Sequence, residues 1–475
     1  MERYEVIVIG GGPAGITLAK ILGKKKRMAV VRPEDFSMVY CAMPYAVEGI
    51  LPIEKTFKKD DLVTGAGADL IRSSVENIDF ENCVVTLSDS TQLGFDEIVI
   101  ATGAVPFIPQ IPGFDLEGVM GFKTEKDMRA VNRMIDGGAT GAVVVGAGAI
   151  GVELAQALNH KGLDVHLVDM VDSVMPNMVD PEMVEQAWAE LEELGIALHL
   201  GSKVTELRGE RCAEEVVLEN GDVIGFDRDG AAADADCRGI VVFAAGMRPV
   251  VSLIEDSGIA TGRDGIIVND RMETNLRGVY AVGDCVQFYS GITGKTAPGK
   301  LATNAVPMAK VLGYNLLGQD RFYRGFYNGS ATKIGRYYIG GTGLTESGAK
   351  QAGFDVVCGS SEVTSKFPIM PGARKIRLKL VADRATGRLL GAQIASEEPV
   401  TDRIDLLTFS IQQQAEIADL TTLSYAAQPY QSCFPAANLV VMAAEKILTK
   451  IMDRVTSPDV SNDWGNRIPN ERCSR

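Results

Sequence analysis

The fold is decided by the stretch Tyr4-Glu-Val-Ile-Val-Ile-Gly10-Gly-Gly12-Pro-Ala-Gly15. An apolar strand runs here into the pattern Gly-x-Gly-x-x-Gly, and a helical segment follows. In such a turn the first glycine permits the tight bend, the second lets the backbone approach a pyrophosphate, and the third lets the helix pack on the strand. The free N–H groups at the helix N-terminus attract the anion. One such motif alone is a weak indication of a dinucleotide site.

The same pattern returns later in the chain as Ala142-Val-Val-Val-Gly146-Ala-Gly148-Ala-Ile-Gly151. It again stands between an apolar strand and a helical segment, and the next strand ends on Asp169. Two such motifs, each in the context that the turn requires, predict two bound dinucleotides. The sequence therefore indicates a protein that transfers electrons between them.

Bulk composition limits the classes of partner. The chain has 475 residues, of which 46% are hydrophobic, and its net charge is −15. We expect about three domains at roughly 150 residues each. The negative charge argues against nucleic acid or an anionic membrane as a partner. No apolar run reaches the ~18 residues of a membrane helix, and the first apolar stretch runs into the glycine turn, so we do not expect it to be a signal peptide.

Eight cysteines are scattered along the chain without any Cys-x-x-Cys pair. In a long chain without an export signal, this pattern predicts reduced thiols in the cytoplasm, with neither a disulfide framework nor a metal site. Cys212 and Cys237 are among the thiols that we expect to be structural or incidental.

The alternation of strands and helices changes along the chain. Strand-like runs at Val84–Leu87 and Glu97–Gly103 precede a proline-rich stretch, and strands are expected at Asp164–Asp169, Gly239–Gly246 and Gly278–Asp284, with a helix near 299–317. From about residue 325, strands at Lys375–Val381 and Leu389–Ile394 flank a turn, and one amphipathic helix is expected near 400–418. The predicted fold class is α/β, with two doubly wound Rossmann-like dinucleotide-binding domains and a C-terminal α+β domain.

Four landmarks carry a resemblance to a known family: Gly10–Gly15, Ala101-Thr-Gly103, Gly146–Gly151 and Ala281-Val-Gly-Asp284, in that order. The chain resembles the FAD-dependent pyridine nucleotide–disulfide oxidoreductases. The resemblance implies a split FAD domain (1–112 and 247–324), an inserted NAD domain (113–246), a C-terminal dimerisation domain (325–452) and a loose tail (453–475). It also implies a homodimer. The FAD site it implies consists of Gly10, Gly12, Pro13, Ala14, Gly15, Arg32, Ala101, Thr102, Gly103, Gly283 and Asp284, with Asp284 on the ribityl chain.

The nicotinamide cofactor is expected to be NADH. Asp169 stands where an acid accepts hydrogen bonds from a ribose 2′-hydroxyl, and a 2′-phosphate would face like charge there. Glu153 resembles the family's glutamate near the nicotinamide. The implied nicotinamide site is Gly146, Gly148, Ile150, Gly151, Glu153, Asp169 and Gly246. In the first motif the equivalent strand end is Arg32, which cannot accept a hydrogen bond, so the effect of this residue on FAD binding is left open.

A single cysteine, Cys41, stands where most well-known members have two. The segment reads Ser37-Met-Val-Tyr-Cys41-Ala-Met-Pro-Tyr45, and none of the three histidines lies in the C-terminal domain, where dithiol members place an acid–base pair. The chain is similar to the single-cysteine branch, and the segment looks like that of coenzyme A-disulfide reductases. Tyr425-Ala-Ala-Gln-Pro-Tyr430 resembles that group's tyrosine pair, which reaches from the partner subunit to the disulfide site.

These residues predict a homodimeric NADH:disulfide reductase with Cys41, Tyr425 and Tyr430 as catalytic residues and no metal. Its expected substrates are coenzyme A disulfide, persulfide or polysulfide, and coenzyme A itself is a candidate ligand. Two alternatives stay open: an NADH oxidase or peroxidase with a Cys41 sulfenic acid, and a flavin-bound redox sensor or electron carrier with negligible turnover. The physiological substrate and the role of Cys433 are also left open.

Overall fold

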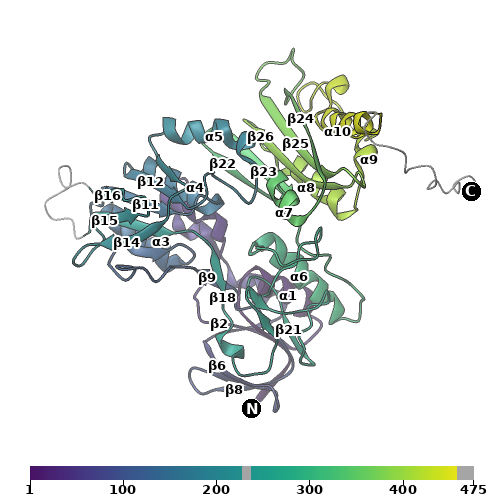
Figure 1. Cartoon of the computed structure of the whole chain (residues 1–475). Coiled ribbons are helices and arrows are strands. Elements are labelled where there is room, and N and C mark those ends of the chain that lie inside the picture. Colours follow the sequence, from purple (N-terminus) through teal and green to yellow (C-terminus); the bar gives the residue numbers. More distant parts are fainter. Residues whose placement is uncertain (227–236, 457–475) are drawn as a thin grey trace, which may run out of the picture.

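The chain folds into three lobes, and the computed structural model describes residues 1–226 and 237–456. Figure 1 shows a lobe around the N-terminus at the bottom, a second lobe at the left and a C-terminal lobe at the upper right. Each lobe contains its own sheet. This arrangement confirms the predicted fold class of two Rossmann-like sheets and a separate C-terminal domain.

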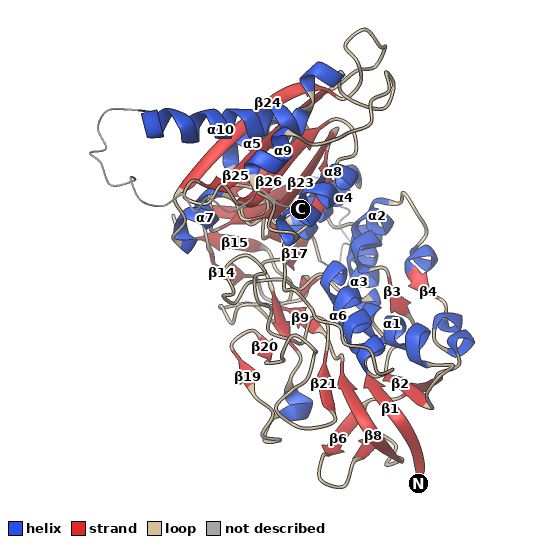
Figure 2. Ribbon diagram, turned by 90° about the vertical axis from the view of Figure 1, so that its right-hand side faces the viewer, coloured by secondary structure: helices blue, strands red, loops and turns tan. Residues whose placement is uncertain are grey.

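The first sheet has the strand order β5-β2-β1-β8-β7-β6, with β21 paired to β8. The strands β5, β2, β1, β8 and β21 are parallel to one another, whereas β7 pairs antiparallel with both β8 and β6. The central strands are continuous apolar runs because both of their faces are covered. Helices α1 and α6 pack against each other in this lobe (Figure 2). The elements are β1 (Glu2–Ile9), α1 (Pro13–Leu22), β2 (Met28–Arg32), β5 (Asp69–Arg72), β6 (Val75–Asp79), β7 (Val84–Leu87), β8 (Gln92–Ile100), β21 (Val279–Ala281) and α6 (Ala302–Asn315).

The second sheet is entirely parallel, in the order β10-β17-β11-β12-β13. A three-stranded antiparallel sheet, β14-β15-β16, lies against one of its faces through a shared apolar cluster. The elements are β10 (Val119–Gly121), α3 (Glu125–Asp136), β11 (Gly141–Val145), α4 (Ala149–His160), β12 (Asp164–Asp169), α5 (Pro181–Glu193), β13 (Ala197–Leu200), β14 (Val204–Arg208), β15 (Glu215–Leu218), β16 (Val223–Gly225) and β17 (Gly239–Phe243).

A two-stranded ribbon connects the first two lobes. β9 (Ala104–Pro106) pairs antiparallel with β18 (Met247–Pro249) where the chain leaves the first sheet and returns to it. The proline-rich stretch thus lies at the crossing that the sequence predicted. Short elements fill the loops of the first lobe and its return: β3 (Ser37–Met38), α2 (Met43–Glu48), β4 (Phe57–Lys58), β19 (Thr261–Gly262), β20 (Gly265–Ile266), and 3-10 turns at Tyr40–Ala42, Ile53–Thr56, Asp60–Leu62, Thr64–Ala66 and Ser252–Ile254.

The C-terminal lobe is an antiparallel sheet in the order β22-β23-β26-β25-β24, covered by helices. Helix α10 extends past residue 452, where we expected the tail to begin, and the remainder of that tail, 457–475, lies outside the described residues. The elements are β22 (Ser330–Ile334), β23 (Tyr337–Gly343), α7 (Glu346–Ala352), β24 (Val356–Thr364), β25 (Lys375–Asp383), β26 (Leu389–Ser396), α8 (Thr401–Gln412), α9 (Ile417–Thr421), a 3-10 turn (Pro435–Ala437) and α10 (Leu439–Thr456).

The single helix predicted near 400–418 is wrong, because the chain breaks there into α8 and α9. Gln414 has a φ of 58°, in the left-handed region that ends a helix. Glu416 then caps α9, in a capping box with Asp419. The residues between the two helices, Gln413-Gln-Ala-Glu416, include neither glycine nor proline, so the sequence pattern did not reveal the break.

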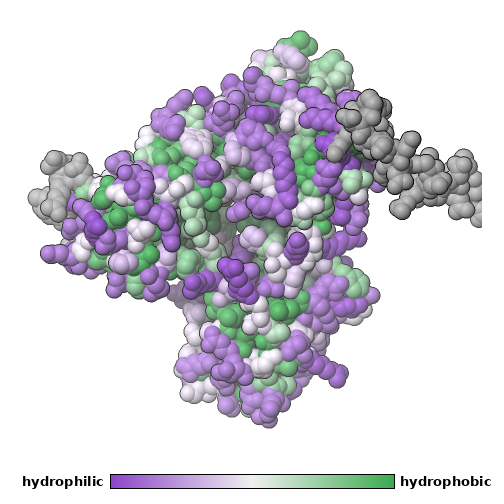
Figure 3. Space-filling view, in the orientation of Figure 1, coloured by the Kyte–Doolittle hydropathy of each residue, from purple (hydrophilic) through white to green (hydrophobic). Residues whose placement is uncertain are grey.

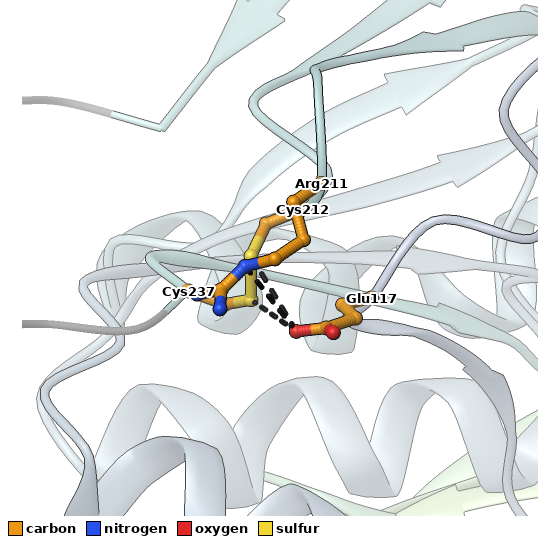
Figure 4. Close-up of a disulfide and its surroundings, with 4 residues drawn as sticks. All are labelled: Glu117, Arg211, Cys212 and Cys237. Carbon is orange, nitrogen blue, oxygen red and sulfur yellow. Dashed lines mark hydrogen bonds and ion pairs between the residues drawn. A yellow bond between two sulfur atoms is a disulfide. The ribbon is translucent and has the colours of Figure 1, made fainter.

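A disulfide joins Cys212 to Cys237, so the expectation of reduced thiols is wrong for this pair. Cys212 lies between β14 and β15, and Cys237 leads into β17. Packing of the small sheet on the second sheet brings their Cα atoms within 5.6 Å, a separation that a disulfide requires. Figure 4 shows Glu117 beside the sulfurs, with its Oε2 atom 3.5 Å from Cys237 Sγ and 3.7 Å from Arg211 Nε. The cysteines are far apart in the sequence, so spacing could not reveal the bond.

Hydrophilic residues cover most of the face drawn in Figure 3, and hydrophobic residues show between them in scattered groups. Within residues 1–226 and 237–456, no helix combines the length and the apolar character that crossing a membrane requires.

Candidate active site

The first glycine turn has the geometry of a dinucleotide cradle. Gly10 has a φ of +121°, and a Cβ there would overlap the carbonyl oxygen of Ala101. A Cβ at Gly15 would overlap the carbonyl oxygen of Gly10, so this glycine lets α1 pack on the turn. Gly12, in contrast, faces open space, where a ligand can approach the backbone. Pro13 begins α1 and Ala14 is buried beneath the turn.

The second glycine turn repeats this geometry. Gly146 has a φ of +118° and lies against Ala244, whereas Gly151 lies against the Gly146 carbonyl oxygen. Gly148 faces open space, as Gly12 does. Ile150, whose side chain is exposed, and Gly246, which has a φ of +117°, lie at the same end of the second sheet. Each Rossmann-like sheet therefore offers one open backbone cradle for a pyrophosphate.

Asp284 lies at the end of β21, at the same edge of the first sheet as the glycine turn. Its Oδ1 atom is buried without a hydrogen-bond partner, whereas Oδ2 lies 3.1 Å from Lys123 Nζ. Gly283, with a φ of +81°, lies against Ala14. The buried oxygen is an acceptor without a partner in the chain, and its contact with the ribityl chain of FAD stays a prediction.

Residues Ala101, Thr102 and Gly103 form the turn that follows β8. The Thr102 hydroxyl donates to the carbonyl of Val250 at 2.7 Å, and the N–H of Val250 donates to Gly103 at 2.9 Å. This turn therefore joins the outgoing chain to the returning chain beside the first cradle.

Arg32 is almost completely buried at the end of β2, with 2% of its surface exposed. Its guanidinium donates to the Ser37 hydroxyl, to the carbonyl of Asp35 at 2.9 Å and to the carboxylate of Asp60. Its Nε atom has no partner, and its side chain lies across Gly11, where a Cβ would overlap it. The Arg32 guanidinium, which can only donate hydrogen bonds, thus occupies the end of β2. The contact of Arg32 with the adenosine ribose of FAD stays a prediction.

Asp169 ends β12, as the sequence predicted. Its Oδ2 atom accepts from the N–H of Ala147, inside the second glycine turn, at 2.7 Å, and its Oδ1 atom accepts from the N–H of Val171 at 2.9 Å. These bonds fix the carboxylate beside the cradle. Its expected contact with a ribose hydroxyl stays a prediction.

Cys41 is a free, exposed thiol in the 3-10 turn Tyr40–Ala42, immediately before α2. We expected it to open a helix, and it lies just ahead of one with six residues. Lys58, on the neighbouring strand β4, is close enough for its charge to interact with that of Cys41. Burial lowers the pKa of Lys58, and the charge of Cys41 opposes this shift.

Lys58 also lines a pocket of about 430 Å³ between α1 and α6, which we did not predict from the sequence. Lys20 and Lys310 line it as well, so three lysines surround one cavity of an acidic chain. The sequence contained one indication of this pocket, because the lining residues Pro13, Thr17 and Lys20 are spaced so that they lie on one face of α1. Lys310, however, lies far along the chain and no sequence pattern connects it to α1.

Glu153 lies on α4 of the second lobe and is bonded to the C-terminal lobe, because its Oε1 atom accepts from the Thr332 hydroxyl of β22 at 2.6 Å. Tyr45 belongs to α2, which packs on α4. Burial raises the pKa of Glu153, and the hydrogen bonds from Thr332 and Tyr45 oppose this shift. The sequence identified Glu153 but not Tyr45 or Thr332.

Tyr425 and Tyr430 lie on the surface of the C-terminal lobe, 43% and 55% exposed. The hydroxyl of Tyr425 donates to the carbonyl of Pro435 at 2.7 Å. Cys433 is buried in the apolar cluster of the same lobe. Within one chain, none of the three side chains has a described contact with Cys41.

Two Rossmann-like sheets, each with an open glycine cradle, and an exposed thiol just before α2, the helix that packs on α4 of the second lobe, define a dinucleotide-dependent oxidoreductase. Comparison with protein families identifies it further: residues 4–309 match the pyridine nucleotide-disulphide oxidoreductase model, and residues 330–435 match the dimerisation domain of that family. The chain belongs to this family, whose members bind FAD and NAD(P)H.

Three relatives show what the chain is similar to. An NADH oxidase of Methanocaldococcus jannaschii is 32% identical over 94% of this chain and 99% of its own length. A CoA-dependent NAD(P)H sulfur oxidoreductase of Pyrococcus furiosus is 32% identical over 85% of this chain and 90% of its own. The solved structure of an NAD-dependent persulfide reductase from A. fulgidus superposes with a TM-score of 0.86, at 29% identity, over 94% of this chain and 83% of that one.

Proposed function

We propose that the protein is an NADH-dependent flavoprotein that reduces a small disulfide or persulfide at Cys41, with coenzyme A disulfide, persulfide or polysulfide as its substrate. The observation that carries this proposal is the position of Lys58. This residue lines the three-lysine pocket, its strand partner Ser37 lies four residues before Cys41, and its charge interacts with that of the thiol. A ligand with its sulfur at Cys41 can therefore extend its anionic groups toward Lys20 and Lys310.

The pocket matches the chemistry of coenzyme A. Its volume of about 430 Å³ falls within the usual size of ligand pockets. Lysine is a common partner of phosphate, and three lysines in one cavity suit a ligand with several phosphate charges. The CoA-dependent relative from Pyrococcus furiosus supports the same substrate class.

The residues of the chain have distinct tasks in this scheme. FAD would be held by the first glycine cradle, where Gly12 faces open space, and it would supply two-electron chemistry between NADH and sulfur. Cys41 attacks the substrate disulfide as a thiolate, forms a mixed disulfide and releases one thiol. Two electrons then cleave the mixed disulfide, which releases the second thiol and restores the Cys41 thiolate. The sum is NADH + H⁺ + RSSR → NAD⁺ + 2 RSH.

The proposal includes a homodimer in the cytoplasm, built through the C-terminal lobe. The match to the family's dimerisation domain supports this assembly. Tyr425 and Tyr430 are exposed and can then reach the Cys41 site of the partner subunit. Asp169 favours NADH over NADPH, because its fixed carboxylate would repel a 2′-phosphate.

The test is NADH oxidation by the purified holoenzyme without oxygen, with coenzyme A disulfide, coenzyme A persulfide and polysulfide as substrates. The wild type is expected to release thiol in proportion to NADH, and Cys41→Ser is expected to abolish this release. Cys433→Ser is the matched control, because this buried thiol has no role in the scheme. Thiol release that persists in Cys41→Ser would refute the proposal.

A second candidate function is that of an NADH oxidase or peroxidase, favoured by the name of the Methanocaldococcus jannaschii relative. In that case Cys41 would cycle through a sulfenic acid, and NADH oxidation would require oxygen or peroxide. A third candidate is an electron carrier without thiol chemistry, for which turnover would be the same in the wild type and in Cys41→Ser.

A further inference from the structure

A carboxylate lies beside the disulfide of the second lobe. Glu117 Oε2 is 3.5 Å from Cys237 Sγ and 3.9 Å from Cys212 Sγ, and the three atoms lie within 4.8 Å of one another. Figure 4 shows the carboxylate group pointing at the sulfurs. Neither sulfur of a disulfide carries a proton, so neither can donate a hydrogen bond to this oxygen. The disulfide itself therefore gives the acid no bond.

Backbone bonds hold these three groups at one end of the second sheet. The N–H of Glu117 donates to the Arg211 carbonyl at 3.0 Å, and the N–H of Ala213 donates to the Glu117 carbonyl at 3.0 Å. These two bonds flank Cys212 and fix it beside Glu117. Glu117 leads into β10 and Cys237 leads into β17, and these two strands pair in parallel. The three side chains therefore stay together when the bond between the sulfurs is broken.

The distances fit a metal ion between the sulfurs and the carboxylate. Zn²⁺ binds thiolate sulfur at about 2.3 Å and carboxylate oxygen at about 2.0–2.2 Å, so tetrahedral angles place a sulfur and an oxygen ligand about 3.5 Å apart. The two sulfur-to-oxygen distances here are 3.5 and 3.9 Å. Two thiolates on Zn²⁺ lie about 3.8 Å apart, and rotation about the Cα–Cβ bonds of the reduced cysteines can open the sulfurs to this separation. Thiolate ligands favour Zn²⁺ over Mg²⁺ and Ca²⁺.

We propose that Glu117, Cys212 and Cys237 form a binding site for Zn²⁺ when the disulfide is reduced. Two molecules of a small thiol, RSH, supply the two electrons: the S–S bond breaks, the two cysteines gain the two protons, and RSSR forms. Zn²⁺ then displaces both thiol protons and is held by two thiolates and the Glu117 carboxylate. Water completes the tetrahedral site. Oxidation by RSSR reverses the sequence and releases the metal ion.

The surroundings of the site suit both steps. Cys237 is half-buried, whereas Cys212 is 7% exposed, so a small thiol reaches the Cys237 sulfur first and Cys212 leaves. Arg211 Nε lies 3.7 Å from Glu117 Oε2, and the side chains of this pair are 60% and 61% exposed. Such an exposed ion pair is weak, so it does not keep the carboxylate from a metal ion. With Zn²⁺ in place, the guanidinium charge balances the single negative charge that two thiolates and one carboxylate leave on the ion.

The site gives the second lobe two ways to hold the same segments. The disulfide joins the connection between β14 and β15 to the start of β17, and the metal ion would join both to the start of β10. A thiol that reduces the disulfide removes the covalent bridge, and Zn²⁺ replaces it with a metal bridge. Bound Zn²⁺ stabilises the folded chain, because the unfolded chain does not keep the three ligands together. This inference is independent of the chemistry proposed for Cys41.

Zinc titration of the holoenzyme tests the site. A Cys41→Ser background removes the exposed thiol, and a phosphine reduces the protein before it is removed without oxygen. In competition with a fluorescent zinc chelator, the reduced chain should bind one Zn²⁺ at this site. The oxidised chain and the double variant Cys212→Ser/Cys237→Ser should lack this binding. Glu117→Gln should raise the Kd for Zn²⁺ at least about tenfold, since loss of even an indirect partner of a metal ligand lowers affinity about 10–100-fold.

Glu210→Gln is the matched control, because Glu210 is an exposed acid two residues before Cys212. Its Kd for Zn²⁺ should stay within about threefold of the parent protein. Zn²⁺ should also raise the midpoint temperature of unfolding of the reduced protein, and it should leave that of the double variant unchanged. The proposal is overturned if the reduced chain binds no more Zn²⁺ than the double variant does. Equal Kd values in Glu117→Gln and Glu210→Gln would also overturn it.

Discussion

Lys379 Nζ lies 2.9 Å from Asp180 Oδ2, and both side chains are nearly fully buried, at 3% and 5% exposure. The same ammonium contacts Glu346 Oε2 at 2.7 Å and the carboxylate of Glu182. Gln393 also donates to Asp180. Asp180 and Glu182 begin α5 of the second lobe, whereas Lys379 and Glu346 belong to the C-terminal lobe. One cation thus joins the lobe of the second glycine cradle to the lobe that carries the dimerisation domain.

The first prediction concerns this cation. Lys379→Met should lower the free energy of unfolding by about 3–5 kcal/mol, because it leaves buried carboxylates without a partner. Urea denaturation of the holoenzyme measures the change. Lys375→Met is the control, since its ion pair with Glu362 is exposed and such pairs contribute about 0–1 kcal/mol. Equal effects of the two substitutions would contradict a structural role for Lys379.

The second prediction concerns the stability of the fold at low pH. Hydrogen bonds from Lys350 and then Lys379 lower the pKa of Glu346 from its ordinary value to about 2. A carboxyl with a depressed folded pKa stabilises the fold above its unfolded pKa, and this contribution is lost as pH falls toward the folded value. Stability should therefore decline between the ordinary glutamate range and about pH 2. The midpoint temperature of thermal unfolding should fall less steeply with decreasing pH in Glu346→Gln than in the wild type. Equal slopes in the two proteins would contradict the prediction.

The third prediction concerns the lysine pocket. Lys20→Ala and Lys310→Ala should each raise the KM for coenzyme A disulfide about tenfold, as expected for the loss of a charge-assisted contact with phosphate. A small aromatic disulfide without phosphate should be reduced at an unchanged KM. Lys25→Ala serves as the control, because Lys25 is exposed and lies outside the pocket lining. A tenfold rise for both substrates in the pocket variants would argue against phosphate binding there.

Local patterns predicted the parts of the fold that depend on adjacent residues. The two glycine turns, the strand ending at Asp169 and the change of architecture in the C-terminal third all follow from periodicity and turn chemistry. The features that the sequence missed depend on packing between distant segments. Cys212 meets Cys237 only because one sheet lies on another, and Lys20 and Lys310 line one pocket only because α1 packs on α6. No sequence pattern pointed to Thr332 either, because its partner Glu153 comes from another lobe.

The fourth prediction concerns the choice of nicotinamide cofactor. Asp169→Ser should lower kcat/KM for NADH about tenfold or more, because hydrogen bonds to a charged acceptor contribute about 1.5–3 kcal/mol. Activity with NADPH should rise, since the repulsion of a 2′-phosphate is removed. Asp172→Ser is the matched control, an exposed acid in the same loop. Initial rates with both cofactors give the ratio of kcat/KM for NADH to kcat/KM for NADPH. If this ratio is unchanged in Asp169→Ser, the ribose does not bind at Asp169.

The last prediction concerns the disulfide between Cys212 and Cys237, which closes a loop with a sequence separation of 25 residues. A cross-link over such a loop stabilises by roughly 3 kcal/mol, mainly by restricting the unfolded chain. Urea denaturation should therefore show a loss of about this size when dithiothreitol is added to the wild type. The double variant Cys212→Ser/Cys237→Ser should match the reduced wild type and should not respond to the reductant. A wild type that is indifferent to dithiothreitol would show that the bond adds nothing to stability, and a further loss in the reduced double variant would trace the effect to another thiol.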